Sequence, residues 1–68
     1  MEYDEIWAVS AERIKAFFEE YGWEATVLPL PMKETGLLMF PQTRVIIRGD
    51  NAEEIHRQFV LHFISAGG

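Results

Sequence analysis

The chain contains no cysteine, few basic side chains and no long hydrophobic run. The lack of cysteine excludes disulfide bonds and thiolate zinc sites, two devices that often stabilise very small domains. A chain of 68 residues buries only a limited fraction of its surface. Since oligomerisation is another common device of this kind, the sequence predicts a homo-oligomer.

The scarcity of basic residues bears on the partners. Six Lys and Arg residues against eleven Asp and Glu residues give a net charge of −5, whereas a surface that follows phosphates needs an excess of basic groups. Arg44 and Arg48 share one face of a predicted strand, but the segment 45–47 between them is aliphatic and offers no ring for stacking on bases. We therefore expect these arginines to form ion pairs with acidic groups, and we expect no nucleic acid partner.

The hydrophobic segments are all too short to cross a bilayer, so no membrane span is expected. The first five residues, 1–5, are acidic where a secretory signal would be basic. These two observations predict a cytoplasmic protein.

The sequence also lacks the constellations that carry catalysis. It has no Gly-x-Ser-x-Gly elbow and no glycine-rich phosphate loop. His56 and His62 are six residues apart, about 240° around a helix, so one metal ion could not easily take both. We expect His56 to be solvated and His62 to interact with the negative end of its helix. No enzyme activity, catalytic residue, metal site or cofactor is predicted.

What the chain does have is material for a core. Hydrophobic residues make up 49% of it, with five Phe, two Trp and two Tyr, which is globular usage. The length is that of one domain, so a single domain over residues 1–68 is expected, with residues 65–68 as a frayed tail.

Two helices are indicated by a pattern that occurs twice. Ser10 is a helix-capping residue before the segment 11–21, and Asn51 takes the same place before the segment 52–64. Each segment has acidic residues in its first turn and apolar residues at helical spacing, and Gly22 is a natural end for the first helix. Each follows a short apolar segment, so the pattern predicts two strand-then-helix units.

The N-terminal segment allows two interpretations. Residues 5–9 are short, apolar and rich in β-formers, which favours a strand. Residues 2–21 also place apolar side chains at helical spacing, so one continuous helix is the alternative.

The middle of the chain is expected to be extended. Residues 24–30 predict a strand that ends at Pro29 or Pro31, because proline cannot donate a hydrogen bond inside a sheet. Residues 32–36 are expected to form a turn. Residues 37–48 then predict one long strand broken by a bulge at Pro41, or two short strands.

The resulting order is β-α-β-β-α, a small α+β two-layer sandwich similar to a ferredoxin-like fold without its fourth strand; the alternative is α-β-β-α with one long N-terminal helix. A right-handed crossover would place the first strand parallel to a neighbour and both helices on one face of the sheet. The truncated sheet would expose an edge, and exposed edges favour association with another chain.

An excess of apolar residues outside the helix cores predicts a contact surface. Residues 37–40, with a nearby methionine, are more hydrophobic than a turn requires, and the C-terminal half of the last helix is apolar nearly all round. The predicted partner-binding residues are Met32, Leu37, Leu38, Met39, Phe40, Val60, Leu61 and Ile64. The alternative is that residues 37–40 pack over the open side of the sheet as part of the core.

Together these features predict a small acidic protein-interaction or regulatory module that acts by self-association and by binding a protein partner. In topology the chain is also similar to short ferredoxin-like regulatory modules such as ACT-like sensors. That resemblance implies a second possible function, the sensing of a small molecule at a subunit interface. A small enzyme or enzyme subunit is the third.

Overall fold

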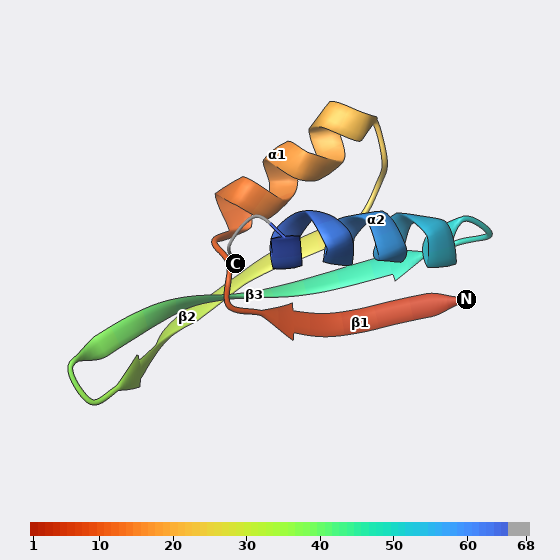
Figure 1. Ribbon diagram of the computed structural model, residues 1–68. Helices are drawn as coiled ribbons and strands as arrows, with labels where there is room; N and C mark the ends of the chain where they lie inside the picture. Colours follow the sequence, from red (N-terminus) through yellow and green to blue (C-terminus); the bar gives the residue numbers. More distant parts are fainter. Residues whose placement is uncertain (66–68) are drawn as a thin grey trace.

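The structure is a computed structural model that describes residues 1–65. Its five elements are β1 (Glu2–Trp7), α1 (Ala11–Tyr21), β2 (Thr26–Thr35), β3 (Leu38–Arg48) and α2 (Ala52–Ser65), as Figure 1 shows. The predicted α+β class is confirmed, and the alternative of one long N-terminal helix is wrong. The predicted N-terminal strand is present, but it covers Glu2–Trp7 and not residues 5–9. The frayed tail predicted for residues 65–68 lies outside the described residues, except that α2 ends at Ser65.

The three strands form one antiparallel sheet in the order β1-β3-β2. Tyr3 is opposite Ile47 in the pairing of β1 with β3, and Val27 is opposite Val45 in the pairing of β2 with β3. The expectation that the first strand lies parallel to a neighbour is therefore wrong. The hairpin that follows α1 turns β3 back into the space between β1 and β2, so both outer strands have an antiparallel neighbour.

The strand β2 runs through Pro29 and Pro31 and ends at Thr35, so the predicted strand end and the predicted turn at 32–36 are both wrong. Proline is tolerated there because β2 is an edge strand, where one row of N–H groups has no partner. The strand β3 likewise continues through Pro41. It is central only over residues 43–48, which pair with β1, so at Pro41 it too has a free edge.

The first helix begins and ends where the sequence predicts. The Ser10 hydroxyl accepts a hydrogen bond from the Arg13 backbone N–H at 3.4 Å, which satisfies one free donor of the first turn. Gly22 has φ of 69°, in the left-handed region, and the Trp23 N–H donates to the Phe18 carbonyl at 3.0 Å. These bonds fix the direction in which the chain leaves α1 for β2.

The core lies between the helices and one face of the sheet. Side chains alternate between the two faces of a strand. The residues that β3 contributes to this core are therefore odd-numbered, namely Thr43, Val45 and Ile47, and all three are buried. The helices contribute a cluster of aromatic and aliphatic side chains, which are Ile14, Phe17, Phe18, Ala52, Ile55, Phe59 and Phe63. Thr43 Oγ1 donates to the Val9 carbonyl at 2.7 Å and so satisfies the one polar side chain buried in this core among the described residues.

Candidate functional site

The β2–β3 hairpin projects beyond the body of the protein as an arm, defined here as residues 30–42 (Figure 1). The pairing of β1 with β3 stops at Thr43, so the arm is a two-stranded ribbon. The molecule consequently measures 41 Å in its longest direction against 21 Å and 17 Å in the others. A two-stranded ribbon is marginally stable by itself, so the arm depends on its continuity with the three-stranded sheet.

The arm has a short turn at its tip and a bulge near its base. Gly36 has φ of 63°, a conformation that glycine adopts readily, and it joins Thr35 to β3 with Leu37. The register shifts between Leu30 and Lys33, so two residues of β2 lie opposite one residue of β3. Such a bulge increases the local twist of a ribbon and turns its tip away from the plane of the sheet.

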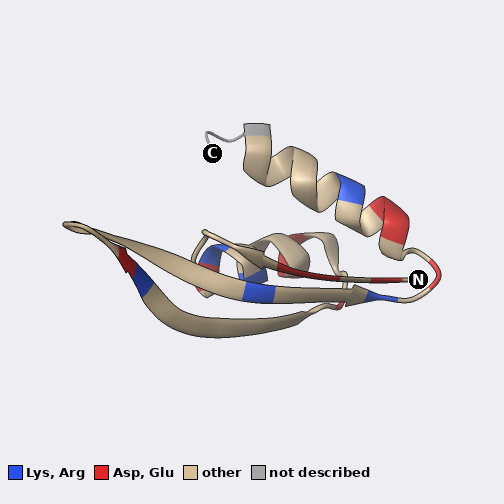
Figure 2. Ribbon diagram, turned by 90° about the horizontal axis from the view of Figure 1, so that it is seen from below, with Lys and Arg blue, Asp and Glu red and all other residues tan. Residues whose placement is uncertain are grey.

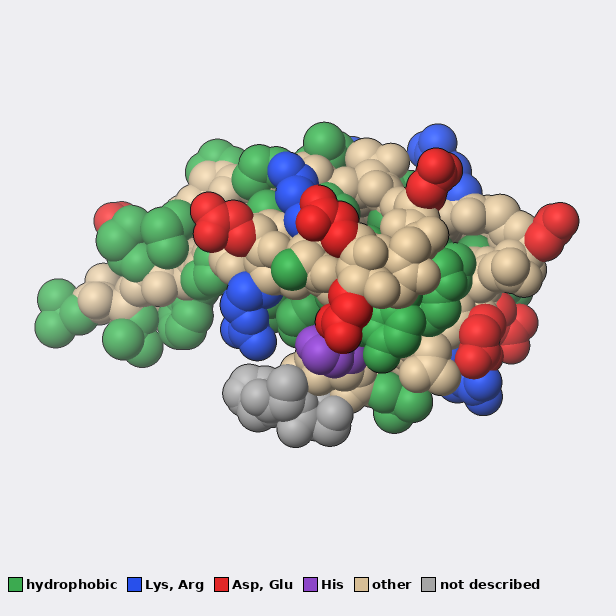
Figure 3. All heavy atoms as spheres, turned by 90° about the horizontal axis from the view of Figure 1, so that it is seen from above, with side chains coloured by type: hydrophobic (Ala, Val, Ile, Leu, Met, Phe, Trp, Pro, Cys, Tyr) green, Lys and Arg blue, Asp and Glu red, His purple; other side chains and the backbone are tan. Residues whose placement is uncertain are grey.

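The side chains of the arm are mostly apolar and exposed to solvent. Leu37 is fully exposed, and the other apolar side chains near the tip are 40–61% exposed: Met32, Leu38, Met39 and Phe40. Figure 3 shows hydrophobic side chains gathered over this projecting end. None of them belongs to the core cluster, so the alternative interpretation of residues 37–40 as core is wrong.

The arm also carries very little charge. Lys33 and Glu34 are the only charged residues of the segment 30–42. They have opposite charges, are adjacent in sequence and lie just before the end of β2 at Thr35; Figure 2 shows how few charged positions the projecting ribbon carries. The arm is therefore a nearly neutral apolar projection from an acidic protein.

The other three predicted contact residues lie on α2. Val60 is half-buried against the core, whereas Leu61 and Ile64 are 55% and 64% exposed. The helix packs on β1 and β3. The predicted residues thus form two sets on different elements, the arm and the outer side of α2.

Two ion pairs lie on the face of the sheet that the helices leave open. Arg44 donates to both carboxylate oxygens of Asp4, at 2.8 Å and 2.5 Å, and Arg48 donates to Glu2 at 2.7 Å. The hydrogen bond from Arg44 lowers the pKa of Asp4. These contacts agree with the expectation that both arginines form ion pairs with acidic groups.

A polar network on the helix side of β1 was not predicted from the sequence. His56 Nε2 lies 2.9 Å from Glu5 Oε1, and the same oxygen accepts a hydrogen bond from Trp7 Nε1 at 3.0 Å. The His56 ring stacks on Tyr3 with a centroid separation of 4.0 Å. The prediction that His56 is solvated is therefore wrong: the network joins β1 to α2, and His56 is half-buried in it.

The network of Glu5 and the ion pair of Asp4 with Arg44 make the stability of the fold depend on pH in the acidic range. Burial raises the pKa of Glu5, but the hydrogen bonds from Trp7 and His56 outweigh burial and leave this pKa below its ordinary value of 4.5. Because the folded-state pKa values of Glu5 and Asp4 are lowered, their contribution is complete above the ordinary values and is lost as pH falls through the folded values.

We therefore expect the free energy of unfolding, measured by urea titration, to fall as pH decreases below about 4.5. In Glu5→Gln this dependence should be weaker, because the titrating carboxylate is gone. A Glu5→Gln profile parallel to that of the unchanged chain would contradict the assignment of the acid sensitivity to Glu5.

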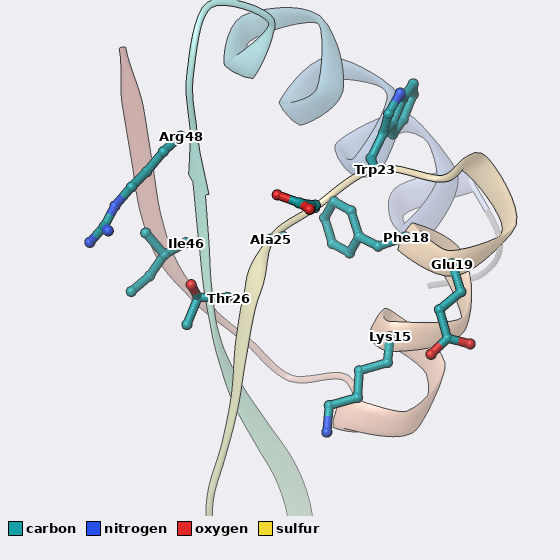
Figure 4. A pocket seen from close by; sticks show the side chains of 9 residues that line it. Lys15, Phe18, Glu19, Trp23, Ala25, Thr26, Ile46 and Arg48 are labelled. Carbon is teal, nitrogen blue, oxygen red and sulfur yellow. The ribbon is translucent and has the colours of Figure 1, made fainter.

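Two hollows lie elsewhere on the surface. The larger, of about 490 Å³, lies between α1 and the start of β2 (Figure 4). Three of its charged side chains do not converge: Lys15 and Glu19 extend from α1, while Arg48 extends on the far side of β3 and is paired with Glu2. The smaller hollow, of about 350 Å³, lies beside Tyr3 and His56. Within residues 1–65 no three His, Asp or Glu side chains are grouped as metal ligands.

Comparison with known proteins gives no relative. No family model matches the chain, and no curated protein or solved structure matches it. In the described part of the chain, no helix is both long and apolar enough to cross a membrane. The case for a function therefore rests on the chemistry of the molecule's own surfaces.

Proposed function

We propose that this chain is a small interaction module that self-associates through its β2–β3 arm and, in that assembled form, acts as a regulatory or adaptor protein for a protein partner. The observation that carries the proposal is that five apolar side chains are exposed on a projection with almost no charge. Four of them are consecutive on one side of the tip and one lies on the other strand: Leu37, Leu38, Met39, Phe40 and Met32.

The composition of the arm suits a protein contact. Met and aromatic side chains are enriched at the centres of protein interfaces, and charged side chains are depleted there. Met is also unbranched and adapts to irregular surfaces. Full burial of one such side chain contributes about 1.5–3 kcal/mol, so a contact made by several of them is strong enough to oppose the entropy lost on association.

We infer further that the fold is a ferredoxin-like sandwich without a fourth strand. The strand order β1-β3-β2 and the position of both helices on one face support this interpretation. The outer edge of β1 has no neighbouring strand within residues 1–65. Small size and an incomplete sheet are both conditions that favour association with a second chain.

The test is the oligomeric state of Leu38→Lys and Phe40→Lys, measured by sedimentation equilibrium from low to high micromolar concentration. Each change puts a charge where the proposal buries an apolar group, so we expect the dissociation constant of the assembly to rise at least about tenfold, the effect of roughly 1.4 kcal/mol. Both side chains are outside the core, so the far-ultraviolet circular dichroism spectrum should stay unchanged.

The matched control is Glu20→Gln on the exposed side of α1. It alters the net charge by the same one unit as Leu38→Lys but leaves the arm intact, so we expect no change in assembly. A chain that is monomeric at high micromolar concentration before any substitution would refute the proposal. So would assembly that tolerates both lysines.

A further inference from the structure

The side of the sheet away from the helices is more apolar than a solvated face requires. Tyr3, Glu5 and Trp7 of β1 contact α2 or the core, so the residues between them lie on the other side. The same alternation and the strand register assign six apolar residues to this side, which we name the open face: Ile6, Leu28, Leu30, Leu38, Phe40 and Ile46. Ile46 is already covered by its own chain and is 7% exposed, so the other five supply the exposed apolar area.

These residues form a band from the body of the protein to the tip of the arm. Ile6 and Leu28 lie on either side of Arg44 in the register, and Leu30, Phe40 and Leu38 follow along the arm. Ile6 is 60% exposed and Leu28 is 41% exposed. An antiparallel sheet with one face in water normally carries polar residues on that face, so the band indicates that another surface covers it.

From this arrangement we propose that the open face packs, sheet against sheet, on the same face of a second copy of this chain. The inference rests on the proposed self-association and specifies its geometry. Two copies would be related by a two-fold axis, with their helices on the outside and both arms lying along the interface. In such an interface both copies contribute the same surface patch.

The distribution of charge favours a second copy over an acidic or basic partner. The charged residues of β1 and β3 on the open face are Glu2 and Asp4, which pair with Arg48 and Arg44. On β2, Lys33 also lies on this side, opposite Phe40 in the register, so the open face carries two acidic and three basic residues. The other nine acidic and three basic residues give the rest of the molecule a net charge of −6. Two acidic copies can approach each other through this nearly neutral face with the least repulsion.

The area that a dimer needs requires both the body and the arm. A stable interface buries about 800 Å² on each partner, which is roughly one sixth of the 4887 Å² accessible surface of this chain. Three strands of six residues, about 4.8 Å apart and rising about 3.3 Å per residue, present a flat area of only about 300 Å². The two strands of the arm add about 190 Å² by the same dimensions, so the continuous band comes closer to the required size than either part alone.

Pairing of strand edges between copies is disfavoured at both edges of the sheet. The outer edge of β2 contains Pro29 and Pro31, which have no N–H to donate to a partner strand. The outer edge of β1 carries Glu2, Asp4 and Glu5 within four residues. Two copies of β1 side by side would bring these like charges together, which is destabilising.

The lack of cysteine allows a direct test by pulsed dipolar spectroscopy on single spin labels. We would label Leu28→Cys on the open face and, as the matched control, Glu20→Cys on the outside of α1. Packed sheets are about 10 Å apart, so the distance between the two Leu28→Cys labels should be below about 30 Å. The Glu20→Cys labels should lie beyond about 40 Å, since a helix layer about 10 Å thick separates each of them from the interface.

Ile6→Lys supplies a second readout, because Ile6 lies on the body and not on the arm. We expect at least about a tenfold rise in the dimer dissociation constant and an unchanged circular dichroism spectrum. A dimer with short distances between the α1 labels, or a dimer indifferent to Ile6→Lys, would overturn this geometry and leave self-association through the arm standing. A chain that stays monomeric at high micromolar concentration would overturn both proposals.

Discussion

Phe59→Ala should leave this protein largely unfolded at physiological temperature. No cooperative unfolding transition should then be observed. Phe59 is completely buried at the centre of the core. Its ring lies 4.9–5.8 Å from four other rings, between centroids, which belong to both helices and β1: Trp7, Phe17, Phe18 and Phe63. Removal of the ring leaves a cavity that all the layers of the fold surround.

The expected cost is about 3–5 kcal/mol, the usual effect of replacing a buried Phe by Ala. Folded proteins have a total stability of about 5–15 kcal/mol, and a domain of this size lies near the lower end of that range. The substitution therefore removes most or all of the stability. A loss below about 1 kcal/mol would contradict the placement of Phe59 in the core.

The measurement is thermal unfolding followed by circular dichroism, with Ile64→Ala as the control. Ile64 is on the same helix but is 64% exposed, so its replacement should change the free energy of unfolding by less than about 0.5 kcal/mol. The comparison separates the loss of core packing from any general effect of alanine on α2.

The helices could be predicted from the sequence because their signals are local. Ser10 and Gly22 fix the ends of α1 through bonds to backbone groups within a few residues. The existence of a strand before each helix could be predicted because the capped pattern occurs twice, but the bounds of the first strand could not, since β1 is Glu2–Trp7 and not 5–9. The order of strands in the sheet could not be predicted in the same way, since it depends on where the hairpin inserts β3 and not on any one residue.

The course of β2 shows how position in the sheet overrides a local rule. Pro29 and Pro31 would end a central strand, because each removes a donor of the ladder. Because β2 has a neighbour on one side only, the two prolines do not end it. The sequence does not reveal how many neighbours a strand has, and so the length of the arm could not be predicted from it.

The candidate contact surface was partly accessible from the sequence. Residues 37–40 are apolar, but no helix or strand pattern required them for the core. The structure shows that their side chains are exposed. The network of His56 with Glu5 was missed because the two residues are 51 positions apart. The alternation of Tyr3, Glu5 and Trp7 was a usable signal, because it places three side chains that can form polar contacts on the side of β1 that faces the helices.

Removal of the arm should convert the protein to a monomer while the body stays folded. The deletion replaces residues 31–41 with Asn-Gly, so that Leu30 and its register partner Gln42 flank a two-residue hairpin turn. No core residue lies in the deleted segment, so the melting temperature of the monomeric body should change by less than about 5 °C. Assembly should become undetectable by sedimentation at high micromolar concentration.

The informative comparison is with a chain that keeps the arm but makes it polar, with Met32→Gln, Leu38→Thr and Met39→Thr together. Gln and Thr remain compatible with a strand, so the ribbon can persist while the exposed apolar area falls. If apolar contact holds the copies together, the polar arm and the deletion should dissociate alike. If only the deletion dissociates, the backbone or shape of the arm makes the contact. A shortened chain that still dimerises would place the interface on the body, whereas one that unfolds would show that the arm stabilises the sheet it extends.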